Sequence, residues 1–150
     1  RIARATSLNM GSVRVRERFF TSDPPSADDL AAAVRFIDEQ LDTVDLTDVR
    51  AWVGVAGTCT SMGALLLGLD AYDRELVEGL VMPREAIEAV VAGLCTTPSA
   101  ELVSPLLPPL RAEVIGAGAL ICARIAGRVE AHMVVSEHDI LDAVAQRLLA

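Results

Sequence analysis

The sequence contains no lysine, because all 13 basic residues among its 150 are arginine. A catalytic Schiff-base lysine and the lysine of a nucleotide-binding P-loop are therefore both excluded. Aromatic residues make up only 3% of the chain, so its core has to be built from Leu, Val, Ile and Ala. No apolar run approaches the ~20 residues of a membrane-spanning helix. No secretion signal is visible either.

Acidic residues outnumber basic ones by 21 to 13, which gives a formal net charge of −8. Nucleic acids and acidic membranes bind basic surfaces, so we expect neither as a partner. Cys59, Cys95 and Cys122 are scattered, odd in number and far from histidine, which indicates neither a disulfide framework nor a zinc site. We interpret them as buried, inert thiols in a reducing cytoplasm. The chain begins at Arg1 rather than Met, which suggests a fragment of a longer protein.

The most informative segment runs from Val53 to Leu65. An apolar run with the make-up of a buried strand turns at Gly57, meets the hydroxyl residue Thr58, and continues as an apolar helix. A glycine lets backbone approach a ligand closely, and a helix start offers unpaired N–H groups to an anion. The segment is therefore either a phosphate or nucleotide cradle or a plain strand-to-helix turn.

The remaining periodicity predicts an α/β layer structure in which parallel strands are joined by helices. Ser26 and Ser136 are expected to cap helices, Pro83 to begin one, and residues 114–125 to form a buried helix. The predicted strands are Ala3–Met10, Ser12–Phe20, Ala51–Ala56 and His132–Val135, with a further short strand in an irregular segment at 70–81. A short helix is expected to begin at Thr97, and Pro105, Pro108 and Pro109 are expected to hold an extended connection.

Two charged groups allow more than one interpretation. In the second predicted strand Val13 and Val15 would lie on one face and Arg14, Arg16 and Arg18 on the other, either solvated or facing phosphate. The cluster Glu137, His138 and Asp139 looks chemically attractive. A structural role at a helix start is the alternative that we favour for it.

Six blocks occur together in a specific order and spacing. They are Ser7-Leu-Asn-Met-Gly-Ser-Val-Arg-Val-Arg-Glu-Arg18, Ser22-Asp-Pro-Pro25, Val53-Gly-Val-Ala-Gly-Thr58, Ala71-Tyr-Asp73, Arg111-Ala-Glu-Val-Ile-Gly-Ala-Gly-Ala-Leu120 and Val134-Val-Ser-Glu-His-Asp-Ile-Leu-Asp142. This arrangement resembles the second domain of the Ppx/GppA phosphatase family, particularly its actinobacterial exopolyphosphatase branch. The resemblance covers nearly the whole chain.

The resemblance implies that residues 1–150 form the second, C-terminal lobe of a two-lobed phosphatase. Such a lobe has a ribonuclease-H-like, actin-like (ASKHA) fold, with a mixed sheet flanked by helices, here lacking its first strand. In the family, Mg²⁺-dependent hydrolysis of a phosphoanhydride occurs in the cleft between two lobes. The substrates are inorganic polyphosphate or guanosine pentaphosphate. The implied partners are the missing N-terminal lobe and a second copy in a homodimer.

The family's catalytic glutamate and its Asp-x-Gly-Gly-Gly-Ser-Thr-Glu loop are both absent from this sequence. We therefore expect no catalytic residue and no metal ligand in this segment, and no turnover from it alone. The expected phosphate-binding residues are Gly57, Thr58, Arg111, Gly116 and Gly118. The alternatives are a salt bridge for Arg111 and helix packing for the last two glycines.

Three functions follow as hypotheses. The first is one wall of the cleft of an exopolyphosphatase. The second is the same fold acting on guanosine pentaphosphate, or binding guanosine tetraphosphate as a regulator. The third, from another class, is a noncatalytic nucleotide-binding or interaction module.

The sequence also departs from the family pattern at Cys59, where valine is usual.

Overall fold

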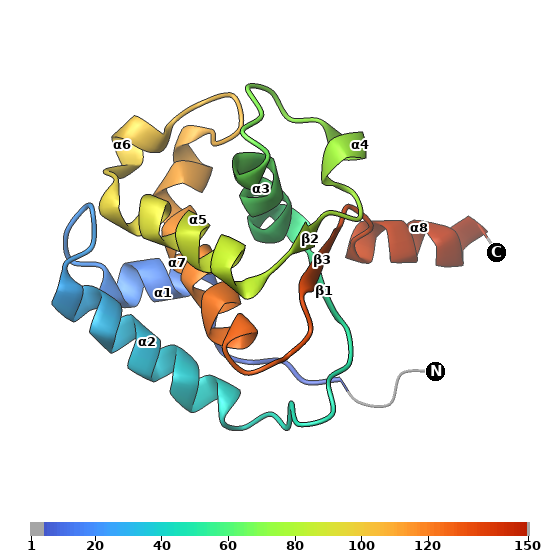
Figure 1. Ribbon diagram of the computed structural model, residues 1–150, viewed down its shortest axis with the longest axis horizontal. Helices are drawn as coiled ribbons and strands as arrows, with labels where there is room; N and C mark the ends of the chain where they lie inside the picture. Colours follow the sequence, from blue (N-terminus) through green and yellow to red (C-terminus); the bar gives the residue numbers. More distant parts are fainter. Residues whose placement is uncertain (1–4, 150) are drawn as a thin grey trace.

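The computed structural model describes residues 5–149 (Figure 1). The chain forms three short strands and eight helices within this range. In order these are α1 (Ser12–Phe19), α2 (Ala27–Leu41), β1 (Trp52–Val55), α3 (Ala56–Leu66), α4 (Arg74–Val77), β2 (Val81–Met82), α5 (Arg84–Thr96), α6 (Ser99–Leu102), α7 (Pro109–Ala126), β3 (Met133–Ser136) and α8 (Ile140–Leu149). The expected mixed α/β class is confirmed.

Helix α7 is the centre of the molecule, and α1, α2, α3, α5 and α6 pack around it (Figure 1). Its middle is buried without interruption from Ile115 to Leu120. This middle stretch is apolar on every side, as a helix surrounded by others has to be. The predicted buried helix at 114–125 is therefore confirmed, although it begins earlier, with Pro109 as its first residue.

The sheet has the strand order β1-β3-β2. Strand β1 runs parallel to β3, with Trp52 opposite Met133 and Val55 opposite Ser136. Strand β2 is antiparallel to β3, so the expectation of parallel strands holds for one pair of the two. The face turned to the helices carries Met82, Met133 and Val135, all fully buried.

The opposite face of the sheet, which we call the outer face, consists of Val53, Val55, Val81 and Val134. The first three are 55%, 46% and 51% exposed, so the described residues leave this face largely uncovered. Strand β1 also has a free edge, because within residues 5–149 it pairs only with β3. An apolar face and an open edge together mark a surface suited to another protein segment.

The prediction of two strands around Gly11 is wrong. The part of Ala3–Met10 that the structure describes forms no strand, and residues 12–19 form helix α1. Val15 is fully buried but Val13 is 53% exposed, so the two valines do not share a face. The predicted arginine row on a strand face is wrong for the same reason. Arg18 instead lies over the rings of Phe19 and Phe36, at 5.2 and 4.7 Å from their centres.

The C-terminal helix begins later than predicted. Ser136 is the last residue of β3 rather than a cap, and Asp139 takes the capping role. Its carboxylate accepts a hydrogen bond from the backbone N–H of Leu141 at 2.7 Å, while Asp142 accepts one from the N–H of Asp139 at 3.0 Å. The structural role that we favoured for Asp139 is thus confirmed. The residue that caps the helix is Asp139 itself, however, and not Ser136. Helix α4, inside the segment expected to be irregular, was not predicted.

The predicted start of α2 is confirmed in detail. The Ser26 hydroxyl accepts from the N–H of Asp29 at 3.1 Å, and the Asp29 carboxylate accepts from the N–H of Ser26 at 3.0 Å. This reciprocal pair satisfies two donors that a helix start otherwise leaves open. At its other end α2 is tied to α7 by Asp38, which receives a bidentate pair from Arg124 at 2.9 and 2.8 Å. Within the described residues, no helix has the length and hydrophobicity needed to cross a membrane.

Candidate phosphate site at three helix starts

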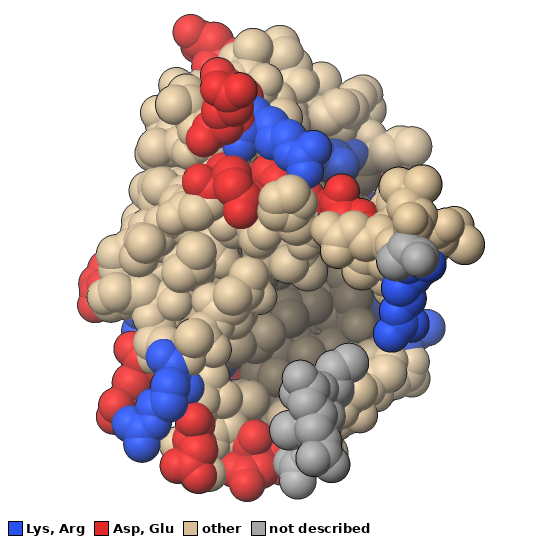
Figure 2. Space-filling model, turned by 90° about the vertical axis from the view of Figure 1, so that its right-hand side faces the viewer, with Lys and Arg blue, Asp and Glu red and all other residues tan. Residues whose placement is uncertain are grey.

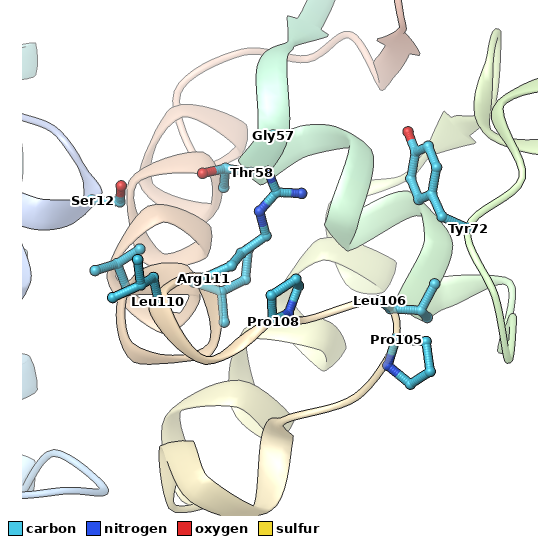
Figure 3. A pocket seen from close by; sticks show the side chains of 11 residues that line it. Ser12, Gly57, Thr58, Tyr72, Pro105, Leu106, Pro108, Leu110 and Arg111 are labelled. Carbon is cyan, nitrogen blue, oxygen red and sulfur yellow. The ribbon is translucent and has the colours of Figure 1, made fainter.

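A cavity of about 610 Å³ opens where α1, α3 and α7 begin (Figure 3). Its polar lining comes from Ser12 of α1, Thr58 of α3, Arg111 of α7 and Tyr72 of the loop before α4. The rest of the lining is Gly57, Pro105, Leu106, Pro108, Leu110, Val114 and Ile115. Three of the five residues expected to bind phosphate, Gly57, Thr58 and Arg111, therefore lie around one cavity.

A sharp turn places the start of α3 at this cavity. Ala56 has a φ of +67°, a left-handed conformation that residues other than glycine rarely adopt. It turns the chain directly from β1 into α3. Val55 stands at the cap position without a side-chain hydrogen bond to the helix. The first N–H groups of α3 are therefore left without a side-chain cap, next to the cavity.

Arg111 reaches from the first turn of α7 to the start of α3 (Figure 3). Its Nη1 donates to the Ser61 hydroxyl at 3.3 Å, and Ser61 is itself only 1% exposed. A Cβ added to Gly57 would lie 3.0 Å from Nη2 of Arg111, so this glycine makes room for the guanidinium. Among residues 5–149, no carboxylate forms an ion pair with Arg111, and the salt bridge considered as its alternative role is absent there.

The three helix starts share a second property. Helices α1, α3 and α7 have no acidic residue in the first turn. Each of the other five described helices has at least one. Acidic residues normally stabilise a first turn by about 0.3–1 kcal/mol, and this chain has 21 of them. Their absence around the cavity leaves the positive ends of three helix dipoles without a neutralising carboxylate.

The cavity can therefore hold an anion, but it carries no group to activate water. Its described lining includes one charged side chain, Arg111, and no carboxylate or histidine. The described residues also bring together no group of three His, Cys, Asp or Glu side chains that could hold a metal ion. The residues present therefore do not fit the Mg²⁺ site that the family resemblance implies.

Gly116 and Gly118 lie in the buried middle of α7 rather than on the cavity wall. A Cβ on Gly116 would lie 3.5 Å from the sulfur of Cys95 and from the Leu94 carbonyl oxygen. A Cβ on Gly118 would lie 2.7 Å from Oγ1 of Thr58. Both glycines thus allow other elements to pack closely on α7, and Gly118 fixes the distance between α7 and the cavity residue Thr58. Direct ligand contact by either remains a prediction.

Two polar lining residues, Ser12 and Tyr72, were not predicted from the sequence. Ser12 begins α1, and the strand interpretation of its segment concealed that helix start. Tyr72 lies across the cavity from Ser12 (Figure 3) and donates a hydrogen bond to Glu137. Burial raises the pKa of Glu137 above its usual value, and the nearby Asp139 adds to the effect. The Glu137 cluster therefore supports a lining residue without lining the cavity itself.

Comparisons with known proteins give one consistent result. A family model described as the Ppx/GppA phosphatase family matches residues 1–138. Exopolyphosphatase 2 of Mycobacterium tuberculosis is 35% identical over 153 aligned residues, which cover 95% of this chain and 48% of that protein. An exopolyphosphatase-like protein of known structure is 34% identical with a TM-score of 0.87, over 97% of this chain and 51% of its own. The Aquifex aeolicus Ppx/GppA enzyme is 28% identical with a TM-score of 0.91, over 97% and 49%. The chain thus spans about half the length of these relatives.

Proposed function

The chain belongs to the Ppx/GppA phosphatase family, and on that premise we propose that its cavity binds phosphate groups of inorganic polyphosphate. In this proposal residues 1–150 are the second, actin-like lobe of an exopolyphosphatase and form one wall of the cleft between two lobes. The enzyme as a whole releases orthophosphate. This lobe holds the substrate, while the water-activating carboxylate comes from the other lobe and the Mg²⁺ ligands lie mostly outside this segment.

The observation that carries the proposal is the meeting of three acid-free helix starts around Arg111. Each start offers about half a positive charge to an anion, and the starts of α1 and α3 add open N–H donors. At α7 the open donor is the N–H of Leu110, because Pro109 has no N–H and the Arg111 N–H bonds to the Pro108 carbonyl at 2.8 Å. The guanidinium adds a full charge that no described carboxylate neutralises. Its planar donors suit bidentate contact with a phosphate. The chain as a whole has a net charge of −8, so the positive potential at this cavity is a local exception on an acidic protein.

The hollow, the free edge of β1 and the outer face form the surface that we propose contacts the rest of the enzyme. Figure 2 shows a hollow whose floor is free of charged side chains and whose rim carries them. It lies on the side of the molecule where Figure 1 places α8. We propose that the free edge of β1 pairs with the first strand of this same second lobe, the strand that the sequence is expected to lack. We also propose that the outer face is covered in the complete protein. A homodimer is the further assembly that we propose.

The apolar part of the cavity lining favours a second candidate. Six of the eleven lining residues are Pro, Leu, Val or Ile, and they could pack against a purine base and ribose. The second candidate is therefore guanosine pentaphosphate hydrolysis or guanosine tetraphosphate binding at the same phosphate subsite. Phosphate release from polyphosphate, compared with release from guanosine pentaphosphate by the two-lobed protein with Mg²⁺, separates the two. If a folded two-lobed protein released phosphate from neither, a noncatalytic nucleotide-binding module would be the better account.

Titration of the present chain with inorganic tripolyphosphate tests the binding role directly. Arg111→Ala removes a charge-assisted contact worth about 1.5–3 kcal/mol, so we expect the dissociation constant to rise by about 10- to 150-fold. Arg84→Ala is the matched control, because Arg84 is exposed, pairs with Glu88 at 2.7 Å and lies off this cavity. Equal affinities of the two variants would refute the role of Arg111.

A further inference from the structure

Two buried thiols meet between α3 and α7. The sulfur atoms of Cys59 and Cys122 lie 3.9 Å apart, in hydrogen-bond contact. The two residues are 63 positions apart in sequence and are 8% and 6% exposed. A disulfide has an S–S distance of about 2.0 Å, so closing the pair needs an approach of about 2 Å. A shift of that size is within reach of side-chain rotation together with a small movement of the first turn of α3.

We propose that Cys59 and Cys122 are a modification site, at which a hydroperoxide joins the two thiols in a disulfide that ties the start of α3 to α7. The contact itself favours the first step at Cys59. The hydrogen bond from the Cys122 thiol lowers the pKa of Cys59, against burial, which raises it. The same contact, together with burial, raises the pKa of Cys122. Cys59 is thus the nucleophile and Cys122 the resolving thiol.

The reaction balances without any group from the protein beyond the two thiols. The Cys59 thiolate attacks one peroxide oxygen, an S–O bond forms, the O–O bond breaks, and the leaving oxygen departs as water or alcohol after taking up a proton. The Cys122 sulfur then attacks the Cys59 sulfur, the S–S bond forms and the S–O bond breaks. Water leaves with the Cys122 proton. In total the two thiols are oxidised by two electrons and one peroxide is reduced.

Cys95 provides the internal comparison. It is buried on α5, and its thiol donates to the Gly116 carbonyl oxygen at 3.7 Å. Burial raises its pKa to about 11, so it holds very little thiolate at neutral pH. Among the described residues, the sulfur–sulfur contact is between Cys59 and Cys122, so Cys95 has no second thiol beside it. Oxidation is therefore expected to be selective for one pair among three cysteines.

The disulfide would act on the cavity through the residue next to it. Thr58 lines the cavity and precedes Cys59, while Gly118 lies one helical turn before Cys122 on α7. The contact between Thr58 and Gly118 leaves no room for even a methyl group. Drawing Cys59 toward α7 therefore has to displace Thr58 relative to Arg111. This consequence rests on the proposed phosphate-binding function, whereas disulfide formation does not.

The experiment is peroxide treatment of the unmodified chain, followed by cleavage after arginine and mass mapping. Arginines at 50, 74, 84, 111 and 124 place each cysteine in its own peptide: 51–74, 85–111 and 112–124. We expect a linked pair of peptides 51–74 and 112–124, a fall in free thiols from three to one, and full reversal by dithiothreitol. Retention of three thiols, a link to peptide 85–111, or links only between molecules would overturn the proposal.

Variants and binding measurements complete the test. Cys59→Ala and Cys122→Ala should each abolish the linked peptides, with Cys59 oxidised but unlinked in Cys122→Ala, and Cys95→Ala should leave the linked peptides in place. If a variant fails to fold, the mapping of the unmodified chain still decides. The oxidised protein should bind tripolyphosphate about tenfold more weakly, the effect of one displaced charge-assisted contact. If the reduced protein binds no tripolyphosphate, the proposed function fails while the mapping result stands. If the linked peptides form without a change in affinity, the coupling to the cavity is refuted.

Discussion

Gly118→Ala adds one methyl group at the closest contact between α7 and the cavity wall. The new Cβ would lie 2.7 Å from Oγ1 and 2.9 Å from Cγ2 of Thr58, and 3.1 Å from the Cβ of Ser12. Carbon atoms pack favourably at about 3.5–4.0 Å. Rotation of Thr58 cannot clear the clash, because both branches of its side chain are already too close. Helices α1 and α3 therefore both have to move away from α7.

The size of the effect follows from two opposing contributions. Overpacking a well-filled site costs about 1–3 kcal/mol, and replacing glycine by alanine inside a helix returns about 1 kcal/mol. We expect Gly118→Ala to lower the free energy of unfolding by up to about 2 kcal/mol. For a chain of this length that lowers the melting temperature by about 2–4 °C for each kcal/mol. It should also weaken tripolyphosphate binding, because Ser12 and Thr58 both line the cavity.

Gly93→Ala is the matched control. Gly93 lies in α5, and a Cβ there would meet nothing within 4 Å. The same substitution should raise the free energy of unfolding by up to about 1 kcal/mol, through helix preference alone. Urea denaturation of the two variants measures the difference. If Gly118→Ala is as stable as Gly93→Ala, the close contact between α7 and Thr58 does not exist as described.

Three further predictions concern the turn, the helix cap and the outer face. Ala56→Gly, at a φ of +67°, should leave thermal stability unchanged or raise it, since left-handed backbone costs alanine about 1–2 kcal/mol. The control Ala64→Gly, inside the same helix, should lower the free energy of unfolding by about 1 kcal/mol. An equal loss of stability in both variants would refute strain at the turn. The Ser26 N–H lowers the pKa of Asp29 from 3.8 to about 2, so Asp29 should stabilise the fold above pH 4 and lose this effect as the pH falls toward 2. In urea unfolding, the free energy of unfolding of Asp29→Asn should change less between pH 4 and pH 2 than that of the unmodified chain. Parallel pH dependences of the two proteins would contradict the assignment. The uncovered outer face and the free edge of β1 should make the isolated chain self-associate, and Val53→Glu should reduce this; light scattering that shows a monomer at all concentrations would count against an incomplete sheet.

Most of the helices could be predicted because their signals are local. Ser26 and Asp29 form a capping box within four residues, and Pro83 sets the backbone for the start of α5. The change from strand to helix was also readable from the apolar run followed by Gly57 and Thr58, but the predicted turning residue is wrong, because the chain turns at Ala56 and Gly57 already lies in α3. These features depend on neighbours in sequence, which a single sequence contains.

The failures arise where packing between distant segments decides. Residues 12–19 alternate valine and arginine like a strand, yet α1 forms because it packs against α7, where Gly118 leaves room for Ser12. The sequence pattern around Ser12 holds no sign of that partner. For the same reason the meeting of three acid-free helix starts, which carries the functional proposal, became visible only in the fold. The pairing of Cys59 with Cys122 likewise depends on α3 crossing α7.

Amide chemical-shift mapping of the reduced chain during titration with tripolyphosphate tests the central claim most directly. The account predicts that the N–H signals at the starts of α1, α3 and α7 move together, with Ser12, Gly57, Thr58 and Leu110 among the largest changes. The C-terminal end of α7, where Arg124 and the following Arg128 are already paired with Asp38 and Asp42, should remain unchanged. Shifts confined to that paired cluster, or spread evenly over the surface, would contradict the proposed phosphate site.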